Sequence, residues 1–418
     1  MPLPCYTVSF SDINTELGLP STSQISMNDA SPRLMATCWA AVPSSTISAC
    51  QLRSSEKFWG TLWVANGPFN CGEAGNNTNN GYNTPVQNID TNSYWMCPGS
   101  QRPGQAFKTD GTLWGWGPWL QVGNSSVSNA NKSSPVQIPG TDWRCIHKGS
   151  TQGVVFGLKC DNTLWVWGTQ PYIYCVGSCF LPGQSCSPVQ IPGSWRDVST
   201  SYQHTIAVKT DNTLWGWGYN INGQVGAGIP ANYCRCISSP LQTAGSWCKG
   251  YAGQFRSVGV RTDGSWWQWG NLHCGIGFPG TSVVTAYTSS PVTVGSGFCT
   301  RDDTFSAQGN YMNVGIPTLG GLAFGIGDTY FLPTTNYTRT ARCYWESSGQ
   351  TAWQVWTDER MTGVRNGSGQ VWRIGILQCQ AFSTDYNCTC DTCFYRQLPG
   401  CWGWATGTRG KFVGIKKQ

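Results

Sequence analysis

The sequence predicts an all-β protein, a seven-bladed β-propeller that follows a short leader. Three observations predict this fold. A tryptophan-rich motif, KTDNTLWGWG at residues 209–218, recurs along the chain. Each copy contains four strand-like segments, and the two ends of the chain supply complementary parts of one copy. The expected domains are a leader at 1–55 and a propeller at 56–418.

The repeat is marked by a tryptophan that follows Leu or Trp. The markers are Trp63, Trp114, Trp165, Trp215 and Trp267, at spacings of 51, 51, 50 and 52 residues. Two weaker copies, GGLAFGIG and NGSGQVWRIG, place Ala323 and Trp372 at the marker. Seven copies near this period are typical of a propeller or a solenoid.

Within one copy, four segments alternate as strands do: SPVQIPG, SWRDVSTS, HTIAVKT and NTLWGWG. The Asp-Gly or Asp-Asn pair before the last segment favours a hairpin turn. Four strands make one propeller blade. Trp215 and Trp217 point to the same face of their strand, and the glycines beside them leave room for a neighbouring blade. We therefore predict that the tryptophans pack between blades, with ligand stacking as the alternative.

The ends of the chain predict closure of the ring. Trp402 and Lys416 are 14 residues apart, as are Trp195 and Lys209. The sequence therefore stops where a TLWGWG strand is due, and GTLWVANG at 60–67 supplies that strand. We predict that Phe412–Lys416 pairs with Gly60–Ala65 in one shared blade, which would leave no open sheet edge between blades.

These motifs resemble the regulator of chromosome condensation family of seven-bladed propellers. The resemblance covers residues 56–418, is strongest in four copies and is weakest between Phe298 and Trp353. The eukaryotic founder of that family is a nucleotide exchange factor that binds chromatin. This sequence shows no basic N-terminal tail, so guanine-nucleotide exchange stays a remote alternative.

The first 55 residues resemble the N-terminal leader of tailed-phage virion proteins. The resemblance is carried by SFSDINTELG at 9–18, ISMND at 25–29 and VPSSTISACQLRSS at 42–55, although Cys50 and Leu52 replace the usual Met and aromatic residue. Such a polar segment does not fold alone. It needs the propeller or another virion protein, or else it is a flexible tail. The apolar residues expected to anchor it are Phe10, Ile13, Leu17, Ile25, Met27 and Leu34.

Composition narrows the functional classes. The net charge of +6 is spread without blocks of like charge, so we expect no nucleic-acid partner. No apolar run is long enough for a spanning helix, so we expect no membrane insertion. The first residues lack the basic start and apolar stretch of a secretory signal.

The titratable residues predict no enzyme. His147, His204 and His273 occupy different places in their repeats, and no catalytic motif is present. The recurring aspartates lie in hairpin turns, at Asp110, Asp161, Asp211 and Asp263. We expect no catalytic residue, no cofactor and no metal.

The chain has 21 cysteines, an odd number. Many lie in connections that should emerge on one face of the propeller: Cys175, Cys179, Cys186, Cys234, Cys236, Cys379, Cys388, Cys390 and Cys393. We predict disulfides among them, because such staples stabilise long loops. Free thiols and a zinc site are the alternatives. Cys97 and Cys145, each two residues after a tryptophan, are expected to be buried as small apolar residues.

A cation precedes the hairpin turn in six copies: Lys108, Lys159, Lys209, Arg261, Arg365 and Lys416. One interpretation is a solvated strand end that discourages edge pairing. The other is a basic ring that attracts an anionic glycan or the acidic surface of a partner.

Together these features predict a non-enzymatic structural or adhesion component of a tailed-phage virion. We expect it on the tail, baseplate or head surface, assembled in the bacterial cytoplasm. The expected partners are other virion proteins, with a host-surface glycan as a further candidate. A lectin-like module of a bacterial surface is the alternative.

Overall fold

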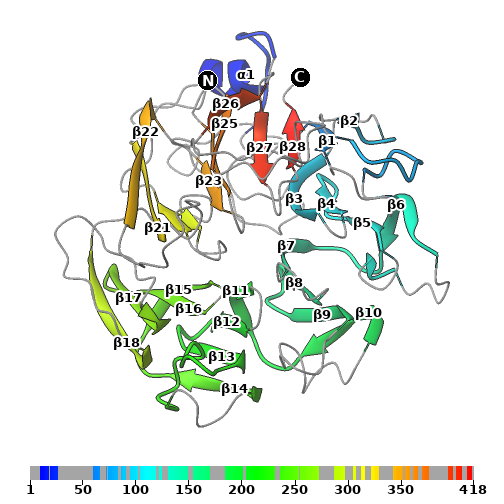
Figure 1. The fold of residues 1–418 in the computed structure, drawn as a ribbon. Coiled ribbons are helices and arrows are strands. Elements are labelled where there is room, and N and C mark those ends of the chain that lie inside the picture. The colour runs from blue at the N-terminus through cyan, green and yellow to red at the C-terminus, as the bar shows by residue number, and fades with distance from the viewer. Residues whose placement is uncertain are drawn as a thin grey trace.

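The strands of this protein lie around a common centre in the computed structural model (Figure 1). The structure describes residues 10–17 and 19–26, most of 60–296, and strands between 305 and 416. Its longest gaps before residue 296 are 27–59, 170–183 and 273–286. Within these ranges the strands form antiparallel sheets of four.

Four sheets follow one another along the first part of the chain. The first comprises β3 (Trp95–Gln101), β4 (Gly104–Lys108), β5 (Leu113–Gly117) and β6 (Lys132–Ile138). The second comprises β7 (Trp143–Lys148), β8 (Val154–Lys159), β9 (Leu164–Thr169) and β10 (Gln184–Ile191). The third comprises β11 (Trp195–Thr200), β12 (His204–Lys209), β13 (Leu214–Tyr219) and β14 (Cys236–Thr243). The fourth comprises β15 (Trp247–Ala252), β16 (Arg256–Arg261), β17 (Ser265–Asn271) and β18 (Tyr287–Ser296).

Two further sheets are built from the later strands, and one joins the two ends of the chain. The fifth comprises β19 (Phe305–Ser306), β20 (Met312–Gly315), β21 (Leu322–Asp328) and β22 (Arg342–Thr351). The sixth comprises β23 (Gln354–Thr357), β24 (Met361–Arg365), β25 (Val371–Gly375) and β26 (Phe394–Leu398). The last has the order β2 (Val86–Gln87), β1 (Thr61–Ala65), β28 (Phe412–Lys416) and β27 (Trp402–Thr406).

The joining sheet pairs the early strand β1 with the late strand β28. All five residues of β1 have partners, from Thr61 opposite Lys416 to Ala65 opposite Phe412. Leu62 and Val64 of β1 are buried beside Trp95, Ala106 and Trp116 of the next sheet. Residues more than 300 positions apart in the sequence therefore share one sheet and its core.

The order of strands in each sheet runs from the centre outward. In Figure 1 the first strands β7 and β11 lie toward the centre, whereas the fourth strands β10 and β14 lie at the periphery. β11 contacts both β7 and β15, the first strands of its two neighbours. This radial arrangement is that of a β-propeller.

The hairpin turns form where the sequence predicts them. Asn162 and Asn212 have φ angles of 66° and 68°, and Gly111 and Gly264 have φ angles of 84° and 81°. Asn and Gly tolerate this left-handed region better than other residues. Each turn joins the second and third strands of its sheet, as between β12 and β13.

The sheets pack on one another through aromatic and aliphatic side chains. Trp217 of the third sheet is fully buried, and its ring lies 6.1 Å from that of Phe156 in the second sheet. Glycine allows the next sheet to approach closely: a Cβ on Gly250 of β15 would lie 2.4 Å from Ile206 of β12. The core therefore lies mainly between sheets.

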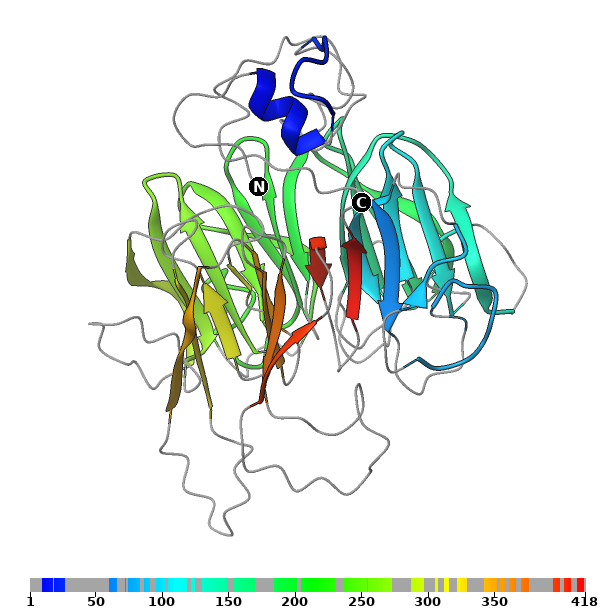
Figure 2. The same cartoon turned by 90° about the horizontal axis from the view of Figure 1, so that it is seen from above.

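The leader contains a short helix, α1 (Phe10–Leu17). Figure 2 shows it beyond one end of the strands. Ile13 and Leu17, one helical turn apart, are buried. Among the described residues, no helix has the length and apolar character needed to cross a membrane.

Candidate functional site

The cations that precede the hairpin turns lie over tryptophan rings. In each of the first four sheets, one cation contacts the tryptophan that opens the first strand and the marker tryptophan of the third strand. The distances to the two ring centroids are 5.0 and 4.1 Å for Lys108, 4.8 and 5.0 Å for Lys159, 5.2 and 4.0 Å for Lys209, and 5.1 and 3.8 Å for Arg261. We call each such group a cation–tryptophan clamp.

A chain of hydrogen bonds fixes the marker tryptophan of each clamp. In the third sheet, the Asp211 carboxylate accepts hydrogen bonds from the backbone N–H of Thr213 at 3.0 Å and from its hydroxyl at 2.6 Å. The Thr213 Oγ1 in turn accepts from Nε1 of Trp215 at 2.8 Å. The same chain runs through Asp110, Thr112 and Trp114, through Asp161, Thr163 and Trp165, and through Asp263, Ser265 and Trp267.

These bonds explain the turn aspartates. The side-chain and backbone hydrogen bonds from Thr213 hold the pKa of Asp211 below its usual range, and Lys209 adds to this effect. A carboxylate that accepts two such bonds is stabilised in its charged form. The motif KTDNTLWGWG therefore encodes one clamp: a cation, a capped turn, a hydroxyl relay and an oriented indole.

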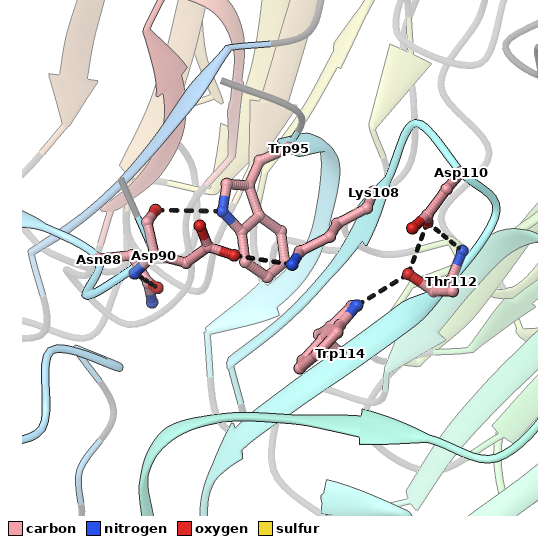
Figure 3. A network of polar contacts seen from close by, with 7 residues as sticks. All are labelled: Asn88, Asp90, Trp95, Lys108, Asp110, Thr112 and Trp114. Carbon is pink, nitrogen blue, oxygen red and sulfur yellow. Dashed lines mark hydrogen bonds and ion pairs between the residues drawn. The ribbon is translucent and has the colours of Figure 1, made fainter. Parts of the chain in front are cut away.

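The clamp in the first sheet contains an additional acid (Figure 3). The Nζ of Lys108 lies 2.7 Å from the Asp90 carboxylate, and both side chains are largely buried, at 18% and 19% exposure. The backbone carbonyl of Asp90 also accepts from Nε1 of Trp95 at 3.3 Å. Sequence reasoning missed Asp90. Its signal is the stretch NIDTNSYW, which stands where the next two repeats have IPG, at 138–140 and 191–193.

The other two predicted cations, Arg365 and Lys416, lie on described strands, but their side chains are outside the described part. Lys416 pairs with Trp402 on one side and Thr61 on the other. Lys209 pairs with Trp195 in the same register. Nε1 of Trp63 donates to Thr61 at 3.0 Å, as in the clamps. The joining sheet thus has the strand register of a clamp and the same hydrogen bond to its marker tryptophan.

A second polar group joins the third and fourth sheets. His204 of β12 is fully buried, and its Nε2 lies 2.7 Å from the hydroxyl of Ser257 on β16. Ser257 donates its proton to the backbone carbonyl of Gln224 at 2.7 Å. Because a carbonyl only accepts, His204 must donate through Nε2–H. This His–Ser pair therefore braces two sheets, since the histidine is not placed to accept the serine proton.

Burial lowers the pKa of His204 to about 3. Its unfolded pKa is near 6.5, so the unfolded chain binds an extra proton between these values. We predict that the free energy of unfolding falls with decreasing pH below 6.5, by about 1.4 kcal/mol per pH unit from this histidine. His204→Gln keeps a donor for Ser257 without titrating. Denaturant unfolding at pH 4–7 should show a shallower slope for this variant, and equal slopes would contradict the prediction.

Three neighbouring first strands, β7, β11 and β15, bring titratable side chains together near the centre of the propeller. Desolvation lowers the pKa of His147 on β7 to about 4, while Asp197 of β11 opposes this shift and Lys249 of β15 adds to it. These residues occupy neighbouring first strands, although the sequence pattern did not single out Asp197 or Lys249. His273 lies outside the described residues.

The predicted disulfide residues are only partly described. Cys236, at the start of β14, is disulfide-bonded. The disulfide assignment for Cys186 is wrong in this structure, where it carries a free thiol. It lies on β10, whose ladder partner β9 has the sequence LWVWGT and offers no cysteine. Cys175, Cys179, Cys234, Cys379, Cys388, Cys390 and Cys393 lie outside the described residues. Cys145 packs half-buried against the core between sheets.

The apolar residues predicted to anchor the leader are also only partly described. Ile13 and Leu17 are buried within the chain itself, and Ile25 is half-buried. The side chain of Phe10, and Met27 and Leu34, lie outside the described part. Asn14 fixes the turn after the helix, since its Nδ2 donates to the carbonyls of Ser21 and Ser23 at 3.1 and 2.8 Å. Residues 10–26 thus contain a locally ordered helix and turn.

Comparison with known proteins supports the fold. A family model for the regulator of chromosome condensation (RCC1) repeat matches residues 195–224, which span β11 to the loop after β13. Yeast RCC1 (Prp20), solved bound to Kap60, is similar with a TM-score of 0.65 and 12% identity over 86% of this chain and 90% of that one. Prp20p from Saccharomyces cerevisiae gives 0.64 and 13% identity over 87% and 92%.

Human WBSCR16 is similar over 86% of this chain and all of that one, with a TM-score of 0.61 and 13% identity. No curated protein matches the chain in sequence. At these sequence identities the structural similarity establishes an RCC1-like β-propeller fold. It does not establish an activity.

Proposed function

We propose that this chain is a non-enzymatic binding protein of a tailed-phage particle, attached through its leader and displaying its propeller. The observation that carries this proposal is the pairing of SFSDINTELG and ISMND, which resemble phage virion leaders, with a propeller of a different family. A common attachment segment joined to exchangeable display domains accounts for that combination. RCC1-like propellers also offer broad surfaces suited to protein partners.

The side-chain chemistry supports binding rather than catalysis. The turn aspartates are held by threonine or serine, and the described clamp cations lie over tryptophan rings. Among the described residues, His204 and Ser257 most resemble a catalytic pair. Both are buried, and their protons are used in hydrogen bonds that hold two sheets together. These groups stabilise a surface on which partners can be recognised.

We also propose that the sheets close into a ring of seven blades. The support is the sheet that combines β1 and β2 with β27 and β28. In such a ring the leader is not needed to complete any blade, because β1 begins at Thr61. The leader is then free to serve attachment.

The leader structure refines how attachment would work. Ile13 and Leu17 are already buried, so they hold the helix on its own chain. Leu19, at 41% exposure, follows the helix and is available to a partner. We therefore assign the particle contact to the exposed side of the helix and turn.

A chain that begins at Ser55 tests this proposal. We expect it to fold with a cooperative thermal transition but to be missing from purified particles, because it lacks the attachment segment. Quantitative mass spectrometry of particles made with the full or shortened chain measures incorporation. A full-length chain carrying Lys132→Met, on β6, is the control and should be incorporated normally.

Incorporation of the shortened chain at normal occupancy would refute attachment by the leader. Absence of the full-length chain from particles, together with its recovery on the bacterial surface, would favour the alternative of a lectin-like bacterial module.

A further inference from the structure

Three of the described clamps hold a cation without an acid partner. In the described ranges, no carboxylate lies within ion-pair distance of Lys159, Lys209 or Arg261, whereas Lys108 at the same position is paired with Asp90 at 2.7 Å. We propose that these three clamps are binding positions for the carboxylates of an acidic protein segment, and that Asp90 is an internal stand-in for such a ligand.

The clamp of the first sheet, which contains Lys108, shows that the geometry accepts a carboxylate. The Asp90 carboxylate reaches Lys108 while that cation stays 4.1 Å from the centroid of Trp114 (Figure 3). Cation–π contact and ion pairing are therefore satisfied together at one ammonium group. Nothing in the clamp has to move away for the acid to bind.

The third and fourth sheets have the same indole-to-carbonyl bond with the acid omitted, whereas Nε1 of Trp143 in the second sheet has no partner in the described part of the chain. The backbone carbonyl that accepts from the first tryptophan belongs to Asp90 in the first sheet, to Pro192 in the third and to Ala244 in the fourth. Pro and Ala carry no charge. Asp90 lies five residues before its tryptophan, whereas Pro192 and Ala244 lie three residues before theirs. An acid at the residue that accepts the indole hydrogen bond thus separates the filled clamp from the open clamps of the third and fourth sheets.

The turn aspartates do not fill the open clamps. The Asp263 carboxylate accepts from the backbone and hydroxyl of Ser265, which directs it toward its own turn. Asp211 is held in the same way by Thr213. Both carboxylates therefore contribute a diffuse field at the cation but no direct contact.

The open clamp of the fourth sheet keeps a donor unused. Nε of Arg261 is buried and makes no hydrogen bond in the described part of the chain. Lys159, Lys209 and Arg261 are all half-buried beside half-buried tryptophans. Partial removal from water strengthens attraction to an incoming carboxylate, and the adjoining indoles add apolar area to the contact.

The arrangement favours a protein segment as the ligand. The carboxylate seen in the filled clamp is an aspartate presented by a polypeptide. The open clamps occupy equivalent ends of the hairpins in three successive sheets, β8–β9, β12–β13 and β16–β17. A segment with several Asp or Glu residues can cross from one clamp to the next. This inference extends the proposed binding role but does not depend on the particle.

The test uses the purified full-length protein and poly-L-glutamate, with binding measured by calorimetry at low salt. We expect binding that is lost in 1 M salt, where the screening length is about 3 Å. Replacing the three open cations by Met keeps an apolar stem and should weaken binding by about fivefold for each clamp. Lys132→Met, at the far end of its sheet from the clamp, is the charge-matched control and should have no such effect.

Asp90→Asn gives a second, opposite test. It frees Lys108 and should tighten binding of poly-L-glutamate by about fivefold, because a fourth clamp opens. This gain of function remains informative if the triple variant fails to fold.

Unchanged affinity in Asp90→Asn, or a loss in Lys132→Met equal to that of the triple variant, would overturn the proposal. Tighter binding of a polyuronate of equal charge would overturn the assignment to protein segments. Particle incorporation does not enter this assay, so its outcome is separate from that of the attachment test.

Discussion

A chain that ends at Leu398 should lose cooperative folding. This truncation removes β27 and β28, which form half of the sheet that contains β1 and β2. Leu62 and Val64 of β1 are almost fully buried and depend on that sheet for their position. Without β28, every backbone pairing group on one side of β1 is exposed as an open edge. Thermal unfolding followed by circular dichroism should show no sharp transition.

Two comparisons separate ring closure from a general effect of shortening. A chain that ends at Lys416 retains all of β28 and should melt like the full chain. A peptide of residues 399–418, added to the chain that ends at Leu398, should restore the transition if the missing strands act by pairing with β1. An unchanged melting transition in the chain that ends at Leu398 would show that the joining sheet is dispensable.

The strand pattern was largely predictable because the hairpin is encoded locally. The alternation of side chains, the Asp-Asn or Asp-Gly turn and the glycines of LWGWG lie within about a dozen residues of each other. The pairing of the two ends could also be predicted, because the distance from Trp402 to Lys416 matches that from Trp195 to Lys209. A repeat supplies its own template for such comparison.

Contacts between sheets could not be predicted in this way. His204 meets Ser257 only because two sheets pack at a particular distance. Asp90 reaches Lys108 from the segment that follows β2, a position that the repeat does not specify. The helix at Phe10–Leu17 was not predicted, because one apolar pair, Ile13 and Leu17, gives a weak periodic signal. The recurrence of a cation before each turn could be seen from the spacing, but the tryptophan contacts of Lys108, Lys159, Lys209 and Arg261 needed side-chain positions.

The paired tryptophans of LWGWG illustrate the same limit. Strand alternation places Trp215 and Trp217 on one face, and both were predicted to pack between blades. The structure divides their roles. Trp217 is fully buried against Phe156 and Trp195, with ring centroids at 6.1 and 6.0 Å. Trp215 is half-buried under Lys209, whose Nζ lies 4.0 Å from its centroid. Trp217 therefore lies within the core between sheets, whereas Trp215 packs against the edge of that core and also forms part of the clamp.

Trp217→Ala should destabilise the protein by about 3–5 kcal/mol, the usual cost of a large cavity in a packed core. Trp215→Ala should cost about 1–2 kcal/mol, because it removes a cation–π contact and one hydrogen bond from a half-buried side chain. The free energy of unfolding from guanidinium titration measures both. The two variants lose the same atoms from the same strand, so their difference reports position alone.

A third variant, Trp217→Phe, tests whether volume is the cause. Phenylalanine refills much of the space beside Phe156 and has no indole N–H, so it should recover a large part of the stability lost in Trp217→Ala. If Trp215→Ala proves as destabilising as Trp217→Ala, the clamp would be as important to the core as the packing between sheets. The division of roles would then be wrong.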